Sequence, residues 1–285
     1  MRKTLATSDQ LQAASSDAYR LQLVTGSLLL PAYALWRREI LRFVRQRSRV
    51  VGAFAQPLVF WLLLGGGLNA SFQPAGMPSG TTYVAYFYPG SIVLLLLFTA
   101  IFDTISTVED RKEGFLQGVL VAPVPRWSIV LGQVLGGTTL AVAQGLLFLL
   151  LAPFLGIPLS FGTLVATTAV MLIVSLALTS LGLIIAWRME STQGFHAIMN
   201  LILIPIWLLS GAFFPASGAP APLRWLMTLN PLSYGMAALR RCLYLNSPAA
   251  AGPVPALLPA LAISVVFCAL TFFVAVRTAR RTTLA

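Results

Sequence analysis

The sequence predicts an all-α integral membrane protein with six transmembrane helices, and three observations lead to this class. The 285 residues are 58% hydrophobic but only 9% charged, against about 25% charged residues in a typical soluble domain. Six apolar segments each approach the roughly 20 residues that a helix needs to cross a bilayer. The basic residues gather on one side of these segments, as they do in multi-pass membrane proteins.

The chain before the first span divides into two parts. Residues 1–32 are mostly polar and predict a flexible cytosolic tail. Residues 33–49 predict an interfacial amphipathic helix, because Tyr33, Trp36, Ile40, Phe43 and Val44 share one face at helical spacing. We expect Trp36 at the membrane interface and the opposite face, with Arg38, Arg42 and Arg45, toward anionic headgroups. The alternative is a basic flank that only orients the first span.

A six-span domain, residues 50–280, follows. The predicted spans are Val50–Leu68, 84–106, 128–153, 164–187, 197–214 and 256–276. If the N-terminus is cytoplasmic, only Arg224, Arg240 and Arg241 of the 19 Lys and Arg residues fall on the outer side. The positive-inside rule therefore predicts that both termini are cytoplasmic. This placement accounts for the net charge of +11 without a nucleic-acid partner.

The connection at residues 107–127 carries the densest cluster of charge between two spans. A charge at the bilayer centre costs about 2.5–3.5 kcal/mol, so this connection must lie in water. An apolar run follows the charges, and a water-exposed apolar run favours a partner surface. We expect a short amphipathic helix here to dock onto a separate motor protein. The alternative is a solvated connector whose charges only set the topology.

The docking hypothesis gives each residue of this connection a role. Phe115, Leu116, Val119, Leu120 and Val121 would be buried in the motor. The carboxylates of Glu109, Asp110 and Glu113 would pair with basic residues of the motor, and Arg111 and Lys112 would make contacts at the rim. Gly114, Pro123 and Pro125 would fix the turn geometry, with Arg126 at the end of the connection.

The last outer connection, residues 215–255, predicts additional short helices. Its segment 223–245 is too polar to span the membrane and too apolar to be fully solvated. Asn230-Pro231 is a turn signal inside it. We expect re-entrant helices, or helices at the outer edge of the membrane, between the fifth and sixth spans.

The chemistry that the sequence lacks narrows the function. The predicted spans carry no charged residue except Asp103, near a cytoplasmic end, so an ion-driven relay is not expected. The sequence has no G-x-x-x-x-G-K-[ST] phosphate loop and a single histidine, His196. We therefore expect no cofactor or metal on this chain and no catalysis by it. A pathway subunit driven by a separate motor is the economical hypothesis.

Three stretches of the sequence resemble the permease subunits of type-2 ABC exporters, the class that includes drug-resistance, nodulation-factor and polysaccharide or lipid exporters. They are E-D-R-K-E-G-F-L-Q-G-V-L-V-A-P-V-P-R at 109–126, S-G-A-F-F-P at 210–215 and N-P-L-S-Y-G-M-A-A-L-R at 230–240. The chain departs from the family where an acidic residue often follows Gly-Thr, because it has Gly114-Phe115-Leu116-Gln117.

The resemblance implies a second permease copy, as a homodimer or close heterodimer, and two ATPase subunits that hold ATP and Mg²⁺. It implies export across the cytoplasmic (inner) membrane of a lipid-like, drug-like, glycolipid or polysaccharide substrate. We expect the substrate to pass along spans 1, 2 and 5. Asn230, Pro231, Tyr234 and Arg240 would shape an outer gate, or else only cap the short outer helices. The rival function is a motor-free channel or assembly scaffold.

Overall fold

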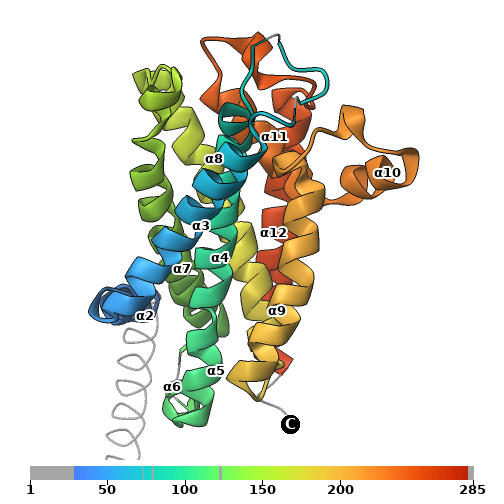
Figure 1. The fold of residues 1–285 in the computed structure, drawn as a ribbon. Coiled ribbons are helices and arrows are strands. Elements are labelled where there is room, and N and C mark those ends of the chain that lie inside the picture. The colour runs from blue at the N-terminus through green and yellow to red at the C-terminus, as the bar shows by residue number, and fades with distance from the viewer. Residues whose placement is uncertain (1–28, 73, 79, 122–123, 282–285) are drawn as a thin grey trace, which may run out of the picture.

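The computed structural model describes residues 29–72, 74–78, 80–121 and 124–281, and within these ranges all regular structure is helical (Figure 1). Six helices are long and apolar enough to cross a membrane. They are α3 (Arg47–Leu68), α4 (Tyr83–Asp103) continued by α5 (Ile105–Lys112), α7 (Arg126–Leu149), α8 (Phe161–Ala186), α9 (Thr192–Trp207) continued by the π-helical turn η2 (Leu208–Ala212), and α12 (Leu257–Arg281). The all-α, six-span prediction is confirmed.

The second and fifth spans differ from their predicted bounds. The helix of the second span continues as α5 to Lys112 instead of ending at residue 106, with only Thr104 between α4 and α5. The Thr104 hydroxyl donates to the Ile101 carbonyl at 2.6 Å, which keeps the chain helical there. The fifth span begins at Thr192 because the Ser191 side chain caps the helix, accepting from the Gly194 amide at 3.0 Å. Most of the charged connection between the second and third spans is therefore helical.

Helix α4 occupies the centre of the bundle. In the most apolar 18 residues of its span, 89% are buried inside the protein. The corresponding share is 17% for the span of α3, 33% for that of α9 and 17% for that of α12. It packs against α3, α7, α8 and α9, and its aromatic side chains are closed off from solvent. The second span is therefore largely covered by its neighbours in the single chain, and its part in the substrate path stays a prediction. The large unburied faces belong to the first, fifth and sixth spans.

The predicted interfacial helix is α2 (Leu30–Arg45), and it crosses the bundle. Figure 1 shows α2 almost end-on, while the spans run between the top and the bottom of the view. Its buried face consists of Ala32, Leu35, Glu39 and Phe43, whereas Tyr33 and Val44 are exposed. The predicted apolar face is therefore only partly correct, because packing against α7 turns a different stripe inward.

Two glycines of α7 let α2 approach closely. A Cβ at Gly132 would lie 2.6 Å from the Ala32 carbonyl oxygen, and one at Gly136 would lie 2.7 Å from the Glu39 Cβ. Small residues four apart are the usual means of bringing helix backbones together within a membrane protein. Helix α2 is thus docked on protein and does not simply rest on lipid.

Short helices complete the fold at both ends. Helix α6 (Phe115–Val121) follows α5 at the end of the bundle near the C-terminus of α12 (Figure 1). The opposite end carries α10 (Ala221–Leu229), α11 (Pro231–Leu243) and the single turns η1 (Ala152–Leu155), η3 (Ala216–Gly218) and η4 (Pro248–Ala251). Helix α11 packs against α8, α12, α4 and η2, and α10 extends to the side. Short helices between the fifth and sixth spans are confirmed.

The close approach of α2 to α7 makes a prediction for Gly132. Changing Gly132→Ala places a methyl group against α2 backbone that has no room to move, and overpacking of this kind costs about 1–3 kcal/mol. We expect a lower melting temperature in detergent, measured by tryptophan fluorescence. The matched control is Gly66→Ala, because nothing lies within 4 Å of a Cβ at that position. Equal stability of the two variants would contradict the proposed packing.

Candidate functional site

The charged residues of α5 form an ionic cluster with α2. Asp110 is 1% exposed and accepts two hydrogen bonds from the Arg38 guanidinium, at 2.7 and 2.5 Å. Arg42 donates to Asp110 at 2.9 Å and to Glu109 at 2.6 Å. Bidentate arginine–carboxylate pairs are both stronger and more directional than single contacts. The cluster therefore joins α2 rigidly to the inner end of the second span.

This arrangement corrects two expectations. Arg38 and Arg42 do not extend toward lipid headgroups, because they face α5. Asp110 is not available to a motor protein, because its carboxylate is buried and both of its oxygens are occupied. Glu109 keeps a third of its side-chain surface exposed but is also paired within the chain. A carboxylate removed from water requires a cation at hydrogen-bonding distance, and α2 supplies it.

Glu39 is an acidic residue buried under the cluster. It is 2% exposed and accepts from Arg38 Nη1 at 3.0 Å. Burial raises the pKa of Glu39, and the neighbouring Asp110 raises it further, while Arg38 and Arg42 oppose the shift. The α2–α5 junction thus contains a carboxyl group that is sensitive to pH. The sequence offered one signal for it, since Glu39 is the single acid among the arginines of residues 33–49.

Arg111 joins the cluster to a third helix. Its guanidinium donates to the Trp187 carbonyl at 2.6 Å and to the Met189 carbonyl at 3.2 Å, and it lies 5.8 Å from the Trp187 ring centroid. These carbonyls are at the C-terminal end of α8, where a cation is favoured by the unpaired carbonyl groups. The Arg111 side chain is thus engaged by the end of α8 and is only partly exposed, and a rim contact with a motor stays a prediction. Lys112 remains exposed.

One face of helix α6 packs against the inner end of the bundle, and its opposite face is exposed. Leu116 is 3% exposed and packs with Val130, Val134, Leu183 and Trp187. Leu120 is half-buried against the same cluster, so neither leucine is free for a motor. Phe115 is 39% exposed with the Arg38 guanidinium 3.9 Å above its ring, and Val121 is 88% exposed. The exposed apolar face is narrower than predicted.

The turns on either side of α6 are fixed by specific groups. Gly114 has φ +78°, a conformation that favours glycine, so its predicted role in the turn agrees with the backbone. Arg126 donates to the Leu120 carbonyl at 2.9 Å and closes the end of α6 onto the start of α7. Pro123 lies outside the described residues. Glu113 and Lys112 flank the turn as exposed side chains.

An open groove of about 840 Å³ runs along α2. It is lined by apolar side chains, by four arginines and, from the turn before α6, by Glu113. Arg38 and Arg42 are already paired with carboxylates of α5, and Arg37 and Arg45 remain exposed. Trp36 is half-buried and donates to the Thr139 hydroxyl at 3.0 Å, so it too contacts α7. The groove therefore combines apolar side chains with exposed charges of both signs.

At the outer end, the predicted gate residues tie helices together. The Asn230 side chain caps α11 by accepting from the Leu232 amide at 3.0 Å, with Pro231 as the first helical residue, and it donates to the Ile206 carbonyl at 2.7 Å. Tyr234 donates to the Thr228 carbonyl at 2.9 Å. Arg240 donates to the Tyr86 carbonyl at 3.0 Å. They connect α11 to α9, α10 and α4 respectively, and capping is part of what they do; a gating role stays a prediction.

The apolar helices, the anchored crosswise helix and the short helices at both ends define a multi-pass, all-α membrane protein. The profile of the ABC-2 type transporter family matches residues 32–244, which cover both the α2–α5–α6 cluster and the outer helices. The chain belongs to this family.

Curated relatives agree with the family. The chain is 26% identical over 212 residues to "Putative transport permease ycf38" of Cyanophora paradoxa, covering 73% of this chain and 72% of the relative. It is 28% identical over 210 residues to "Nodulation protein J" of Rhizobium leguminosarum bv. trifolii, covering 73% and 79% respectively. These similarities support a transport subunit rather than a catalyst.

The ionic cluster predicts a marked effect of Asp110→Asn. The change leaves two arginines without their shared carboxylate, and breaking a buried pair costs roughly 3 kcal/mol. We expect a clearly lower melting temperature of the purified protein, and loss of most of that effect in an Arg38→Met/Asp110→Leu double variant. Glu113→Gln is the matched control, because Glu113 is exposed. An unchanged melting temperature of the Asp110→Asn variant would contradict the stabilising role of the cluster.

The raised pKa of Glu39 predicts a defined pH dependence. The unfolded chain ionises this carboxyl near pH 4.3 and the folded protein does so at higher pH. Its contribution to stability is therefore full below about pH 4.3 and is lost as the pH rises through the folded pKa. We expect the melting temperature of wild type, relative to Glu39→Gln, to fall between pH 4.5 and 7.5. A constant difference over this range would refute the prediction.

Proposed function

We propose that this chain is the membrane subunit of an ATP-driven exporter that works with a separate ABC ATPase. Family membership supports the pairing with an ATPase, and the similarity to "Nodulation protein J" supports a role in export. The complex would contain two copies of this chain and two ATPase subunits. ATP and Mg²⁺ would bind to the ATPase, and this chain would hold no cofactor.

The observation that carries the proposal is the open face of α6 beside the groove along α2. Val121 and part of Phe115 present apolar surface next to the charged side chains of Lys112 and Glu113. Apolar anchors with a charged rim are typical of protein docking surfaces. Arg37 and Arg45, which are exposed, would pair with acidic side chains of the partner, whereas the sequence predicted basic ones.

The contacts of α5 explain how a push on α6 would reach the spans. The ionic cluster links α5 to α2, Arg111 links it to α8, and α5 itself is the inner end of the central second span. A movement of α6 therefore displaces these elements together, because none can slide without breaking buried polar contacts. Closure of the ATPase on ATP would use this linkage to favour an outward-open packing.

The location and cargo follow from the same family role. The chain would lie in the cytoplasmic membrane with both termini inside, so that α2, α5 and α6 face the cytoplasm. The unburied faces of α3, α9 and α12 would contact lipid or a second copy, and the substrate would cross between the two copies. Residues of apolar character dominate these faces, which suits a lipid-like, drug-like, glycolipid or polysaccharide-linked substrate.

Docking can be tested with a single exposed residue. In Val121→Asp, a desolvated contact would be replaced by a charge, so binding of the partner ABC ATPase should weaken by about tenfold or more. Pull-down from detergent measures it. The control, Leu245→Asp, changes a comparably apolar exposed residue at the outer end, and should bind normally. Undiminished binding of Val121→Asp would remove the docking surface.

Energy coupling is tested by reconstitution in vesicles. A fluorescent short-chain glycolipid should move outward only when the chain, its ATPase and ATP are all present. Movement with the chain alone would favour the motor-free channel. Binding of the ATPase without any nucleotide-dependent movement of glycolipid, drug or lipid probes would favour the assembly scaffold.

A further inference from the structure

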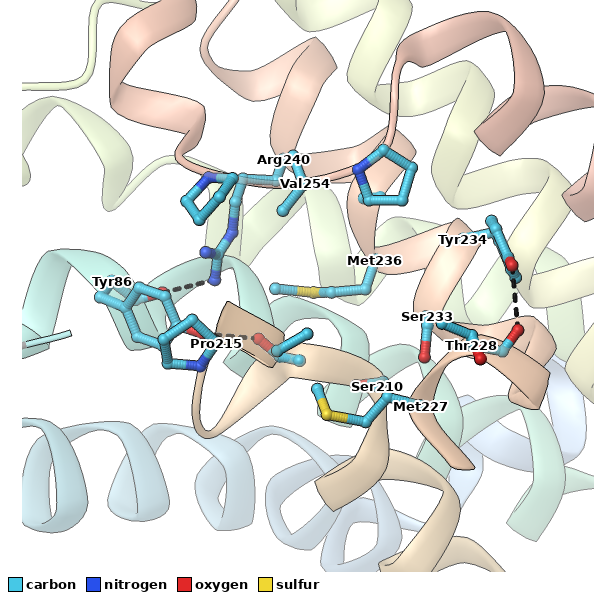
Figure 2. Close-up of a pocket in the computed structure, with 15 residues that line it drawn as sticks. Tyr86, Ser210, Pro215, Met227, Thr228, Ser233, Tyr234, Met236, Arg240 and Val254 are labelled. Atoms are coloured by element: carbon cyan, nitrogen blue, oxygen red, sulfur yellow. Dashed lines mark hydrogen bonds between the residues drawn. The ribbon is translucent and has the colours of Figure 1, made fainter. Parts of the chain in front are cut away.

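A partly open cavity lies at the outer end of the protein, away from the α6 face. It has a volume of about 100 Å³ and is lined by residues of α4, η2, α10 and α11 and by residues 215–216 and 253–255 (Figure 2). A single water needs about 10–15 Å³ measured in this way, so the cavity is large enough for a phosphate-sized group. Met227 and Met236 contribute apolar, adaptable walls.

Arg240 is the single charged residue among the described side chains that line this cavity. Its side chain points into the cavity together with Met236 (Figure 2). The residue is 2% exposed, Nη2 donates to the Tyr86 carbonyl, and the guanidinium lies 4.2 Å from the Tyr86 ring centroid. The Nε atom is buried and has no hydrogen-bond partner in the described chain.

A buried guanidinium is usually balanced by a carboxylate, and none of the described residues that line this cavity carries one. The sequence contains no Asp or Glu between Glu39 and Asp103, and none after Glu190. The four elements around the cavity and the outer half of α4 therefore contain no acidic residue at all. The Tyr86 hydroxyl donates to the Gly211 carbonyl at 2.9 Å and also interacts with Arg240, but it is neutral and does not balance the charge. A second copy of the chain could not supply the missing charge, because its outer side has the same composition.

We propose that this cavity binds the anionic group of an amphiphile, a phosphate, sulfate or carboxylate that accepts from Arg240 Nε while the attached apolar stem packs on Met227 and Met236. The counter-ion then comes from the ligand. The site is separate from ATPase docking, and its ligand can be a lipid headgroup or a soluble anion, which share the same chemistry.

The test uses the purified full chain in zwitterionic nanodiscs without any ATPase, so its outcome is independent of docking and transport. Dodecyl phosphate, inorganic phosphate and neutral dodecyl maltoside are titrated, and the shift in melting temperature gives each affinity. We expect dodecyl phosphate to stabilise wild type and Arg240→Gln to bind it about tenfold or more weakly, because a charge-assisted hydrogen bond is lost. Arg224→Gln, which removes an exposed outer arginine, should bind as wild type does.

A second variant keeps the proposal testable if Arg240→Gln does not fold. Met236→Glu places a carboxylate in the same cavity, so it should satisfy Arg240 internally, retain or raise the melting temperature without ligand, and lose dodecyl phosphate binding. Binding of inorganic phosphate with the same dependence on Arg240 would support the anion site and assign it to a soluble anion. Equal binding by wild type, Arg240→Gln and Met236→Glu, or equal stabilisation by dodecyl maltoside, would overturn the proposal.

Discussion

The structure at the inner end depends on one interaction, the bidentate pair between Arg38 of α2 and Asp110 of α5. An acidic residue at 1% exposure is tolerable only with cations in direct contact. This requirement places α2 across the bundle and holds it beside the inner end of the second span. The glycines of α7 meet the same need from the other side, because they remove the side chains that would keep α2 at a distance.

The charged connection is consequently a stiff element and not a flexible loop. Arg111 secures α5 to the end of α8, Leu116 packs below α7 and α8, and Arg126 closes the far turn. Most of the charges in this region are satisfied inside the chain, so little of the cluster remains for a partner. What is left exposed is a small apolar edge of α6 and a groove along α2. A rigid α5–α6 segment with a small contact surface would pass a partner's movement to the spans, which a mobile loop would not do.

The outer end follows a different rule. Asn230 and Tyr234 use neutral polar groups to join short helices, and every hydrogen bond that they make within the described chain is local to that end. Arg240 is the exception, since its charge is buried where no carboxylate exists. The buried charges at the inner end are therefore neutralised within the chain, and the outer end leaves one buried cation, Arg240, without a carboxylate beside it.

The sequence by itself determined the six apolar spans, the crosswise helix before them, the turn at Gly114 and the cap at Asn230. Each of these depends on hydropathy, on charge placement or on the conformational preference of a single residue, and all are local properties. The tertiary structure alone decided the partners of Arg38, Asp110, Arg111 and Arg240. Lipid headgroups, a motor protein and other parts of the chain are equally good partners for an isolated charge. Only the folded arrangement brings Arg38 to a carboxylate 72 residues away and leaves Arg240 with none, because the choice depends on distance and burial, which a linear pattern does not contain.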